Sequence, residues 1–327
     1  VAGRATEGTA YDNLTGTVPL PAGSSIATIL IENIAADSLV EGTDTVAITM
    51  TGITASDPGI TIDAANDDDT IDIFDNDAAL VSIAGTTDGD EDGPVDGVFT
   101  VTQSTTAISD TVLSYSVTGG ATEGTDSDNL TGSVTIPAGS TSATILIENI
   151  AADSLVEGTE TVTITLTGIT ASDPGITIDA ANDDDAIDIF DNDAATVSIA
   201  GTTDGNETGP VAGVFTVTQT TTAVSDTVID YTVTGSATEG TDYDSLSGTV
   251  TIGAGTTSET IDISNIVADS LVEGTETVVI TLDAITASDP GISIGTASDR
   301  MKIIDGDRAS VSIAGTTDGN ETGPITG

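Results

Sequence analysis

The stretch VSIAGTTDGDEDGPVDGVFTVTQ, residues 81–103, decides the fold of this chain. Its two ends, 81–83 and 97–103, alternate Val, Ile or Phe with Ser, Thr or Gly, which is the period of a half-buried strand. Between them Gly, Asp and Pro interrupt the alternation, as they do in turns. The stretch therefore predicts two strands joined by a loop.

The sequence on either side continues this pattern. Further alternating or apolar runs, separated by Gly, Asp, Asn, Ser and Pro, begin at Asp110, Leu130, Ser142, Glu160 and Ala186. No stretch carries a helical period of useful length. Seven short strands predict an all-β fold, an antiparallel Greek-key sandwich of the immunoglobulin-like kind. The side chains expected to face its core are Val217, Ile145, Ile147, Ile164 and Leu166.

The same unit recurs along the chain. The segment ADSLVEGT begins at Ala36, Ala152 and Ala268, in two steps of 116 residues, and a two-residue deletion follows Gly291. Such a fixed period indicates an array of one module. We predict a partial module of C-terminal strands at 1–77, complete modules at 78–193 and 194–307, and the first strand of a further module at 308–327.

Composition excludes several classes of function. The 327 residues include 54 acidic and 4 basic side chains, a net charge of −50, and no His, Cys or Trp. Ser-His-Asp and Cys-His catalysis, thiolate zinc sites and disulfides are thereby excluded. The charge also argues against nucleic acid and anionic lipid as partners, and no apolar run has the roughly 20 residues of a membrane span. Without Trp, and with few aromatics at repeated packing positions, a glycosidase is disfavoured, and we expect no enzyme.

Four motifs mark the third copy of the repeat. They are E-x-x-P-x-x-G-x-F-T-V-T from Glu207, ATEGTDYD from Ala237, TVTIGAG from Thr249, and ADSLVEGTET from Ala268 with a terminal D-x-D. In these motifs the chain resembles the Calx-β domains of extracellular bacterial repeat proteins, integrin subunits and sodium/calcium exchangers. The resemblance covers the whole chain as two full and two partial copies. It implies β-sandwiches in which loop carboxylates gather at one end and bind Ca²⁺.

Calcium also suits the residues on chemical grounds, because it takes six to eight hard oxygen ligands. The matching positions in 78–193 are Glu91, Asp126, Asp153, Glu157, Asp191 and Asp193. Those in 194–307 are Glu207, Asp242, Asp269, Glu273, Asp305 and Asp307, and those in 1–77 are Asp37, Glu41, Asp75 and Asp77. Ala152 and Ala268 replace the first of the family's paired aspartates, so we expect one or two ions per module. Ala10 stands where the other copies have Asp126 and Asp242, so we expect a weaker site there.

A simpler alternative is that the acidic loops are only solvated, as on the Asp-rich surfaces expected of proteins from high-salt habitats. We assign this role, in a solvated loop, to the run Asp183–Asp185, with an ancillary ion as the alternative. If the named positions do bind calcium, the D-N-D-A-A junction at 191–195 leaves no flexible linker, and a cation there would lock the joint.

These features favour a calcium-rigidified repeat of an extracellular filament, stalk or adhesin at the cell surface or in the matrix. Identical modules or chains would join head to tail in an open assembly, and any glycan ligand would belong elsewhere in the parent protein. The alternative function is a calcium-sensing or carbohydrate-binding module of a larger protein.

Overall fold

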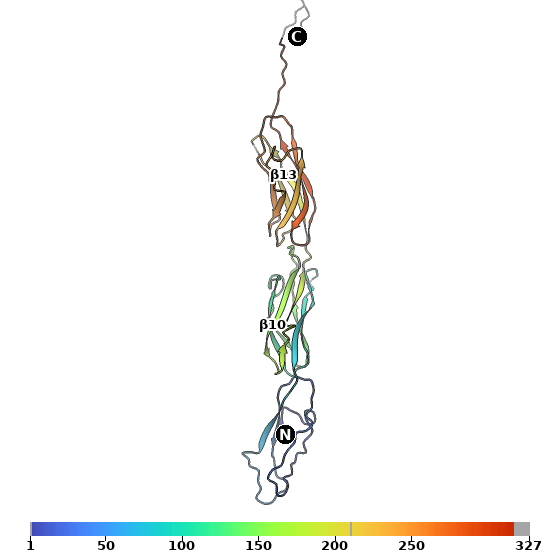
Figure 1. The fold of residues 1–327 in the computed structure, drawn as a ribbon, viewed down its shortest axis with the longest axis vertical. Coiled ribbons are helices and arrows are strands. Elements are labelled where there is room, and N and C mark those ends of the chain that lie inside the picture. The colour runs from blue at the N-terminus through green and yellow to red at the C-terminus, as the bar shows by residue number, and fades with distance from the viewer. Residues whose placement is uncertain (1, 94, 210, 317–327) are drawn as a thin grey trace, which may run out of the picture. The chain divides into compact units, whose positions relative to one another are not determined.

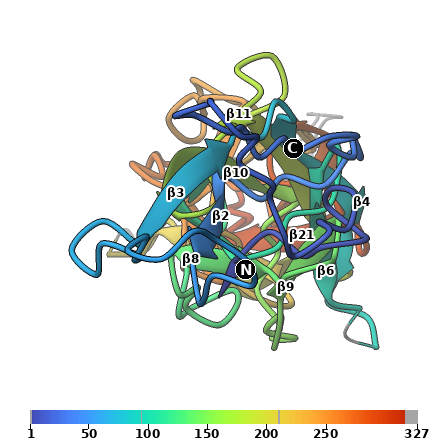
Figure 2. The same cartoon turned by 90° about the horizontal axis from the view of Figure 1, so that it is seen from below.

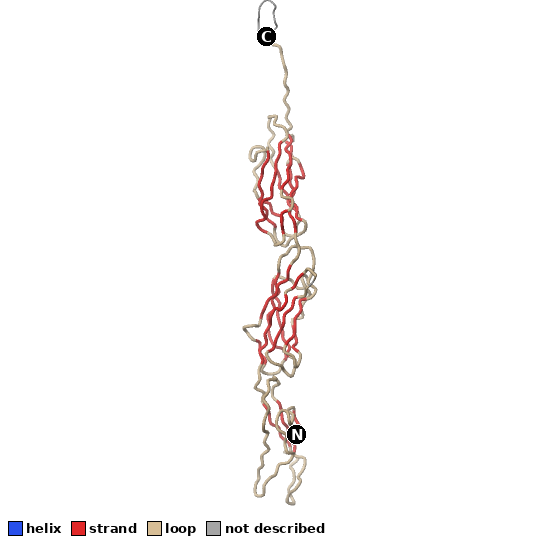
Figure 3. The backbone as a smooth tube through the Cα atoms, turned by 90° about the vertical axis from the view of Figure 1, so that its right-hand side faces the viewer, coloured by secondary structure: helices blue, strands red, loops and turns tan. Residues whose placement is uncertain are grey.

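The computed structural model describes residues 2–93, 95–209 and 211–316. All regular secondary structure in these ranges is β-strand (Figures 1 and 3). No helix in the described ranges has the length and apolarity needed to cross a membrane. By its contacts the chain divides into two units: unit 1 comprises Val1–Ala152 and Thr159–Phe190, and unit 2 comprises Asp153–Gly158 and Asp191–Gly327.

The first part of unit 1 is a three-stranded antiparallel sheet. Its strands are β1 (Ala2–Gly3), β2 (Asp44–Thr49) and β3 (Asp68–Ile73), in the order β1-β2-β3. Figure 2 shows β3 beside β2, with which it pairs along its whole length. Ala5, Tyr11 and Val46 form the small buried core of this part.

The second part of unit 1 is a complete β-sandwich. Its strands are β4 (Ala79–Thr87), β5 (Gly89–Asp90), β6 (Gly97–Gln103), β7 (Thr111–Gly119), β8 (Ser133–Ile136), β9 (Ser142–Ile147), β10 (Glu160–Ala171), β11 (Ile176–Ile178) and β12 (Asp184–Phe190). One sheet has the order β5-β12-β10-β7-β8 and the other β11-β4-β6-β9. The edge strands β5 and β11 pair in parallel, and the other pairs are antiparallel.

Unit 2 repeats this architecture. Its strands are β13 (Ala195–Thr203), β14 (Gly205–Asn206), β15 (Gly213–Gln219), β16 (Thr227–Gly235), β17 (Thr249–Ile252), β18 (Ser258–Ile263), β19 (Glu276–Ala287), β20 (Ile292–Ile294) and β21 (Ser298–Ile304). The sheet orders are β14-β21-β19-β16-β17 and β18-β15-β13-β20. Residues 308–316 follow as chain outside any strand, with Val311 and Ile313 fully exposed.

The core is built as the alternation predicts. The five side chains expected to face inward are all buried, the most exposed at 5% (Ile145). Inward residues of both sheets form one apolar cluster in each sandwich, because successive side chains of a strand point to opposite faces. The all-β Greek-key prediction is thus confirmed.

Three expectations need correction. Each sandwich has two more short strands than the seven predicted, β5 and β11 in the first. Asp184 and Asp185 are not in a solvated loop: they begin β12, and Asp185 accepts a hydrogen bond from Gly85 N at 2.8 Å. The aromatics do not all pack, since Phe74 is 76% exposed and Phe190 41%. Asp184 and Asp185 pair with Thr165 and Ile164 of β10, Phe190 pairs with Asp90 of the short strand β5, and Phe74 directly follows β3.

Residues 18–34 keep the apolar pattern of β8 and β9 but form no strand. Val18, Leu20 and Ile29 are exposed, whereas their counterparts Val134, Ile136 and Ile145 are buried. In the complete sandwich β8 pairs with β7 and β9 with β6.

Candidate metal centre

Three carboxylates of unit 2 meet beside the pairing of β14 with β21, and we call them the Glu207 triad. Asn206 lies opposite Ile304 in this parallel pair, and Glu207 N donates to Ile304 O at 3.1 Å. Glu207 directly follows β14 and Asp305 directly follows β21, so the register of the pair places them side by side. Glu207, Asp305 and Asp307 each contribute one carboxylate oxygen, and these three oxygens lie within 4.8 Å of one another.

A second group, the Asp242 triad, consists of Asp242, Glu273 and Glu276, with oxygens that also lie within 4.8 Å of one another. Glu276 is the first residue of β19, and Glu273 lies three residues before it. Asp242 belongs to a turn in which its N donates to Thr238 O at 2.9 Å. Its carboxylate in turn accepts from Thr238 N at 2.6 Å, which fixes the side chain.

Asp305 connects the two triads through the backbone. Its Oδ2 accepts hydrogen bonds from Glu273 N at 2.9 Å and Gly274 N at 2.8 Å, and its Oδ1 accepts from Asp307 N at 2.6 Å. Gly274 has a φ of 83°, a left-handed conformation that suits glycine and lets two successive N–H groups face one oxygen. The bonds from Asp307 and Gly274 lower the pKa of Asp305.

The other carboxylates of the two triads repel one another. Burial, followed by the charges of neighbouring acids, raises the pKa of Glu207, Glu273 and Glu276. Glu207 is only 8% exposed. Oε2 of Glu276 is buried and has no hydrogen-bond partner. A buried acceptor of this kind is costly unless a donor or cation reaches it.

Of the six positions predicted in this module, five fall into the triads. The sixth, Asp269, lies outside them, and its Oδ1 accepts from Leu271 N at 2.7 Å. Glu276 was missed by the sequence prediction. Its signal is that position 276 and its counterparts 160 and 44 all carry a carboxylate, three residues after the predicted Glu and at the first residue of a strand.

The predicted residues of module 78–193 belong to different units, Glu91 and Asp126 to unit 1 and Asp153, Glu157, Asp191 and Asp193 to unit 2. Within unit 2, Asp191 repeats the contacts of Asp305. It accepts from Glu157 N and Gly158 N at 2.9 Å each and from Asp193 N at 2.7 Å. Asp153 accepts from Leu155 N at 2.6 Å.

The unit 1 residues of this module also have the expected local setting. Glu91 is 6% exposed and follows β5, with its N donating to Phe190 O at 3.2 Å. Asp126 accepts from Thr122 N at 2.5 Å, as Asp242 does from Thr238. Ligation of an ion by these residues remains a prediction.

The first module has only part of the pattern. Asp75 accepts from Glu41 N at 2.9 Å and from Asp77 N at 2.8 Å, and Asp37 accepts from Leu39 N at 2.8 Å. Among residues 2–77 no three carboxylates form a group like the triads. The weaker site expected where Ala10 replaces an aspartate stays a prediction.

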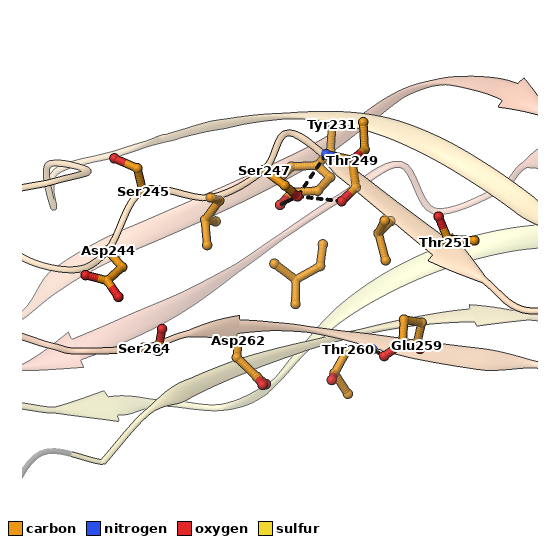
Figure 4. A pocket seen from close by; sticks show the side chains of 13 residues that line it. Tyr231, Asp244, Ser245, Ser247, Thr249, Thr251, Glu259, Thr260, Asp262 and Ser264 are labelled. Atoms are coloured by element: carbon orange, nitrogen blue, oxygen red, sulfur yellow. Dashed lines mark hydrogen bonds between the residues drawn. The ribbon is translucent and has the colours of Figure 1, made fainter.

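A separate depression lies at the open edge of the unit 2 sandwich, between edge strands β17 and β18 (Figure 4). It is lined mainly by Ser, Thr and acidic residues, including Asp244, Glu259 and Asp262. Tyr231, its one aromatic residue, is 5% exposed and therefore presents no open ring face. The depression thus offers no platform on which a sugar ring could stack.

Comparisons with known proteins place the chain in a family. A family model described as the Calx-beta domain matches residues 75–193 and 190–307. The comparison with curated proteins gave no match.

Several solved structures resemble the chain at low identity. The calcium binding domain CBD12 of CALX1.1 is 16% identical with a TM-score of 0.31, and CBD12 from CALX1.2 is 14% identical with a TM-score of 0.29. Both alignments cover 68% of this chain and 99% of that chain. A two-domain protein of unknown function from Bacteroides fragilis is 10% identical, with 58% of this chain and 89% of that chain covered and a TM-score of 0.25.

The assignment rests on the family model rather than on these scores. Since its two matches span well over half of the sequence, the chain belongs to the Calx-beta domain family, whose domains are calcium-binding modules.

Proposed function

We propose that this chain is a calcium-rigidified structural repeat of an extracellular filament, stalk or adhesin. The observation that carries the proposal concerns the ADSLVEGT segment, which holds acidic side chains of the candidate metal centre and also packs, within unit 2, against residues that follow it in sequence. Calcium bound by the segment would therefore hold the contact between modules.

The donor set fits calcium. Its side-chain donors are all carboxylates, and the chain has no His or Cys that would favour a softer metal. The buried Oε2 of Glu276 lacks a donor, and the pKa of Glu207, Glu273 and Glu276 is raised by burial and repulsion. Bound Ca²⁺ would supply the missing positive charge. The residues that would hold it in this module are Glu207, Asp305, Asp307, Asp242, Glu273 and Glu276.

The docking contact lies between the acidic residues of the segment. In unit 2, Val156 is fully buried and packs with Ala195 and Ala223, between Asp153 and Glu157 in sequence. Val156 N donates to Thr222 O at 3.0 Å, and Val224 N donates to Val156 O at 3.1 Å.

The same contact occurs in unit 1. Val40 is fully buried, its N donates to Thr106 O and its O accepts from Ile108 N, both at 3.0 Å. The third copy of the segment differs, because Leu271 is 60% and Val272 56% exposed. The exposed Leu271 and Val272 could be covered by a further identical module, through the turn equivalent to residues 222–224. Head-to-tail joining of identical modules in an extracellular scaffold is the role that such a surface supports.

Calcium titration tests the proposal. We expect the melting temperature of the chain to rise with Ca²⁺ concentration in a chelator-buffered series at fixed ionic strength. Binding to the native state alone stabilises by about 2.7 kcal/mol at 100 times Kd. The double variant Asp305→Asn/Asp307→Asn should lose the shift in unit 2, and Asp262→Asn, an acid of the edge depression, should keep it. Equal melting curves in chelator and in calcium would refute the proposal.

A further inference from the structure

Position 4 departs from the repeat in a way that bears on the metal centre. It carries Arg4, one of four basic residues in the chain, where the equivalent positions hold Gly120 and Ser236. Six residues later, Ala10 stands where the other copies have an aspartate. The first module has therefore lost an acid and gained a base in the same short stretch.

Strand pairing holds Arg4 beside Asp44, the residue of the first module that is equivalent to Glu276. Gly3 pairs with Val46, and Ala5 N donates to Thr45 O at 3.2 Å, so the residue between them lies next to Asp44. In unit 2, Ser236 N donates to Thr277 O at 3.0 Å, which places position 236 beside Glu276 in the same way. The two positions correspond in structure as well as in sequence.

The Arg4 side chain uses this location. Its Nε lies 3.0 Å from Oδ1 of Asp44, whose side chain is 12% exposed. Oδ1 is buried and accepts no hydrogen bond, so the guanidinium provides its charge compensation. Burial and the neighbouring acids raise the pKa of Glu41, and Arg4 opposes that rise. Two carboxylates and a guanidinium thus stand where unit 2 has three carboxylates.

We propose that the Arg4 guanidinium replaces the metal ion at this position, so that the first module has a built-in cation where module 194–307 requires Ca²⁺. The inference rests on the proposed function for the calcium requirement of the Asp242 triad. It predicts two kinds of module in one array, one held by an ion pair and one by a dissociable metal.

Hydrogen exchange followed by mass spectrometry tests the difference within the intact chain. On transfer from calcium to chelator, amides at the start of β19 after Glu276 should lose protection at least tenfold. The equivalent amides of β2 after Asp44 should change less than twofold. Arg4→Gln should lower β2 protection equally in calcium and chelator, because Asp44 is then buried without a cation.

Transfer of the arginine to unit 2 is the stronger test. Ser236→Arg with Asp242→Ala should remove the calcium response of β19 and raise its protection in chelator above that of Asp242→Ala alone. Ser236→Gln with Asp242→Ala is the matched neutral control and should give no such rise. If the arginine and glutamine variants behave alike in chelator, or if β2 and β19 respond equally to calcium, the inference is wrong.

The two proposals fail in different ways. If neither strand of the wild-type chain responds to calcium, the proposed function fails. If β19 responds and the arginine variants show none of the expected effects, the proposed function stands and the role of Arg4 is refuted.

Discussion

Glu276 shows at the scale of one residue why the metal centre is costly without a cation. Its Oε2 is buried with no hydrogen-bond partner, and its pKa is raised by burial and then by Asp242 and Glu273. The backbone nevertheless holds it in place, because it begins β19 opposite Ile303 of β21. The fold thus holds an unfavourable charge that a bound cation would stabilise.

Neutralising this charge should have opposite effects with and without calcium. In chelator, Glu276→Gln should raise the stability of unit 2, by about 1 kcal/mol, because one of three mutually repelling acids is removed. In saturating calcium it should reduce the stabilisation gained from the ion. Thermal unfolding measures both effects. Asp283→Asn, an exposed acid on the same strand, is the control and should change neither by more than about 0.5 kcal/mol.

The pH dependence in chelator follows from the raised pKa values of Glu207, Glu273 and Glu276. A group whose pKa is higher in the folded state stabilises the fold when protonated. That contribution is present below the ordinary value of 4.5 and is lost as pH rises through the folded value. Asp305 has a lowered pKa, so its contribution is present above 3.8 and is lost only at lower pH.

We therefore expect the melting temperature of unit 2 in chelator to increase as pH falls from 7 to 5. In saturating calcium the trend should reverse, since protons compete with the ion for the carboxylates. A melting temperature in chelator that falls over this range would contradict the assignment of these three acids as the repelling groups.

Most of the candidate site could be predicted because the repeat and the family resemblance point to the same loops. Glu276 was missed because it begins a strand, where it reads as part of the strand pattern. Asp269 was predicted to share the site, but its carboxylate accepts a local hydrogen bond from Leu271 N and lies outside both triads. The charge of Asp269 nevertheless helps to raise the pKa of Glu207 and Glu273, so its share in the site stays a prediction.

At the scale of elements, the ADSLVEGT segment carries acids of the candidate metal centre together with a valine whose exposure differs between copies. Val156 and Val272 are the same residue of the segment in successive copies, with exposures of 0% and 56%. The main strands were predictable from the alternation of apolar and polar residues. The short strands β5, β11, β14 and β20 were not, since two or three residues are too few to show a period.

The valine pair supplies a matched test of the docking contact. Val156→Ala removes two methyl groups from a fully buried position and should destabilise unit 2 by about 2 kcal/mol. Val272→Ala makes the same chemical change at an exposed position and should cost less than about 0.5 kcal/mol. Urea unfolding of both variants provides the comparison. Equal losses would show that burial of Val156 contributes nothing to stability.

At the scale of the whole molecule, the net charge of −50 acts on every module. Self-repulsion of this size destabilises a compact state and is reduced by salt, with a screening length of about 10 Å at 0.1 M ionic strength. Both charge screening and specific binding predict that a calcium salt raises the stability of the fold. Screening can be supplied by any salt, whereas specific binding requires calcium itself.

Sodium chloride separates the two effects. Raising NaCl from about 0.05 to 0.5 M in chelator should increase the melting temperature by screening alone. Millimolar CaCl₂ should give a further shift that persists at 0.5 M NaCl, whereas MgCl₂ at the same concentration should give a smaller one. A calcium effect that vanishes at high NaCl would favour acidic loops that are merely solvated.

The burial of Val156 gives the array a direction. The segment that carries this valine is covered in unit 2 by residues that follow it in sequence, so a segment covered in this way depends on its C-terminal neighbour for part of its order. In an array each repeat contacts only its neighbours. If each repeat is stabilised by the repeat after it, unfolding spreads more readily toward the N-terminus than toward the C-terminus. A pull or a protease that opens one module uncovers the segment before it and leaves the following module's own turn intact. Damage would therefore travel toward the N-terminus, module by module.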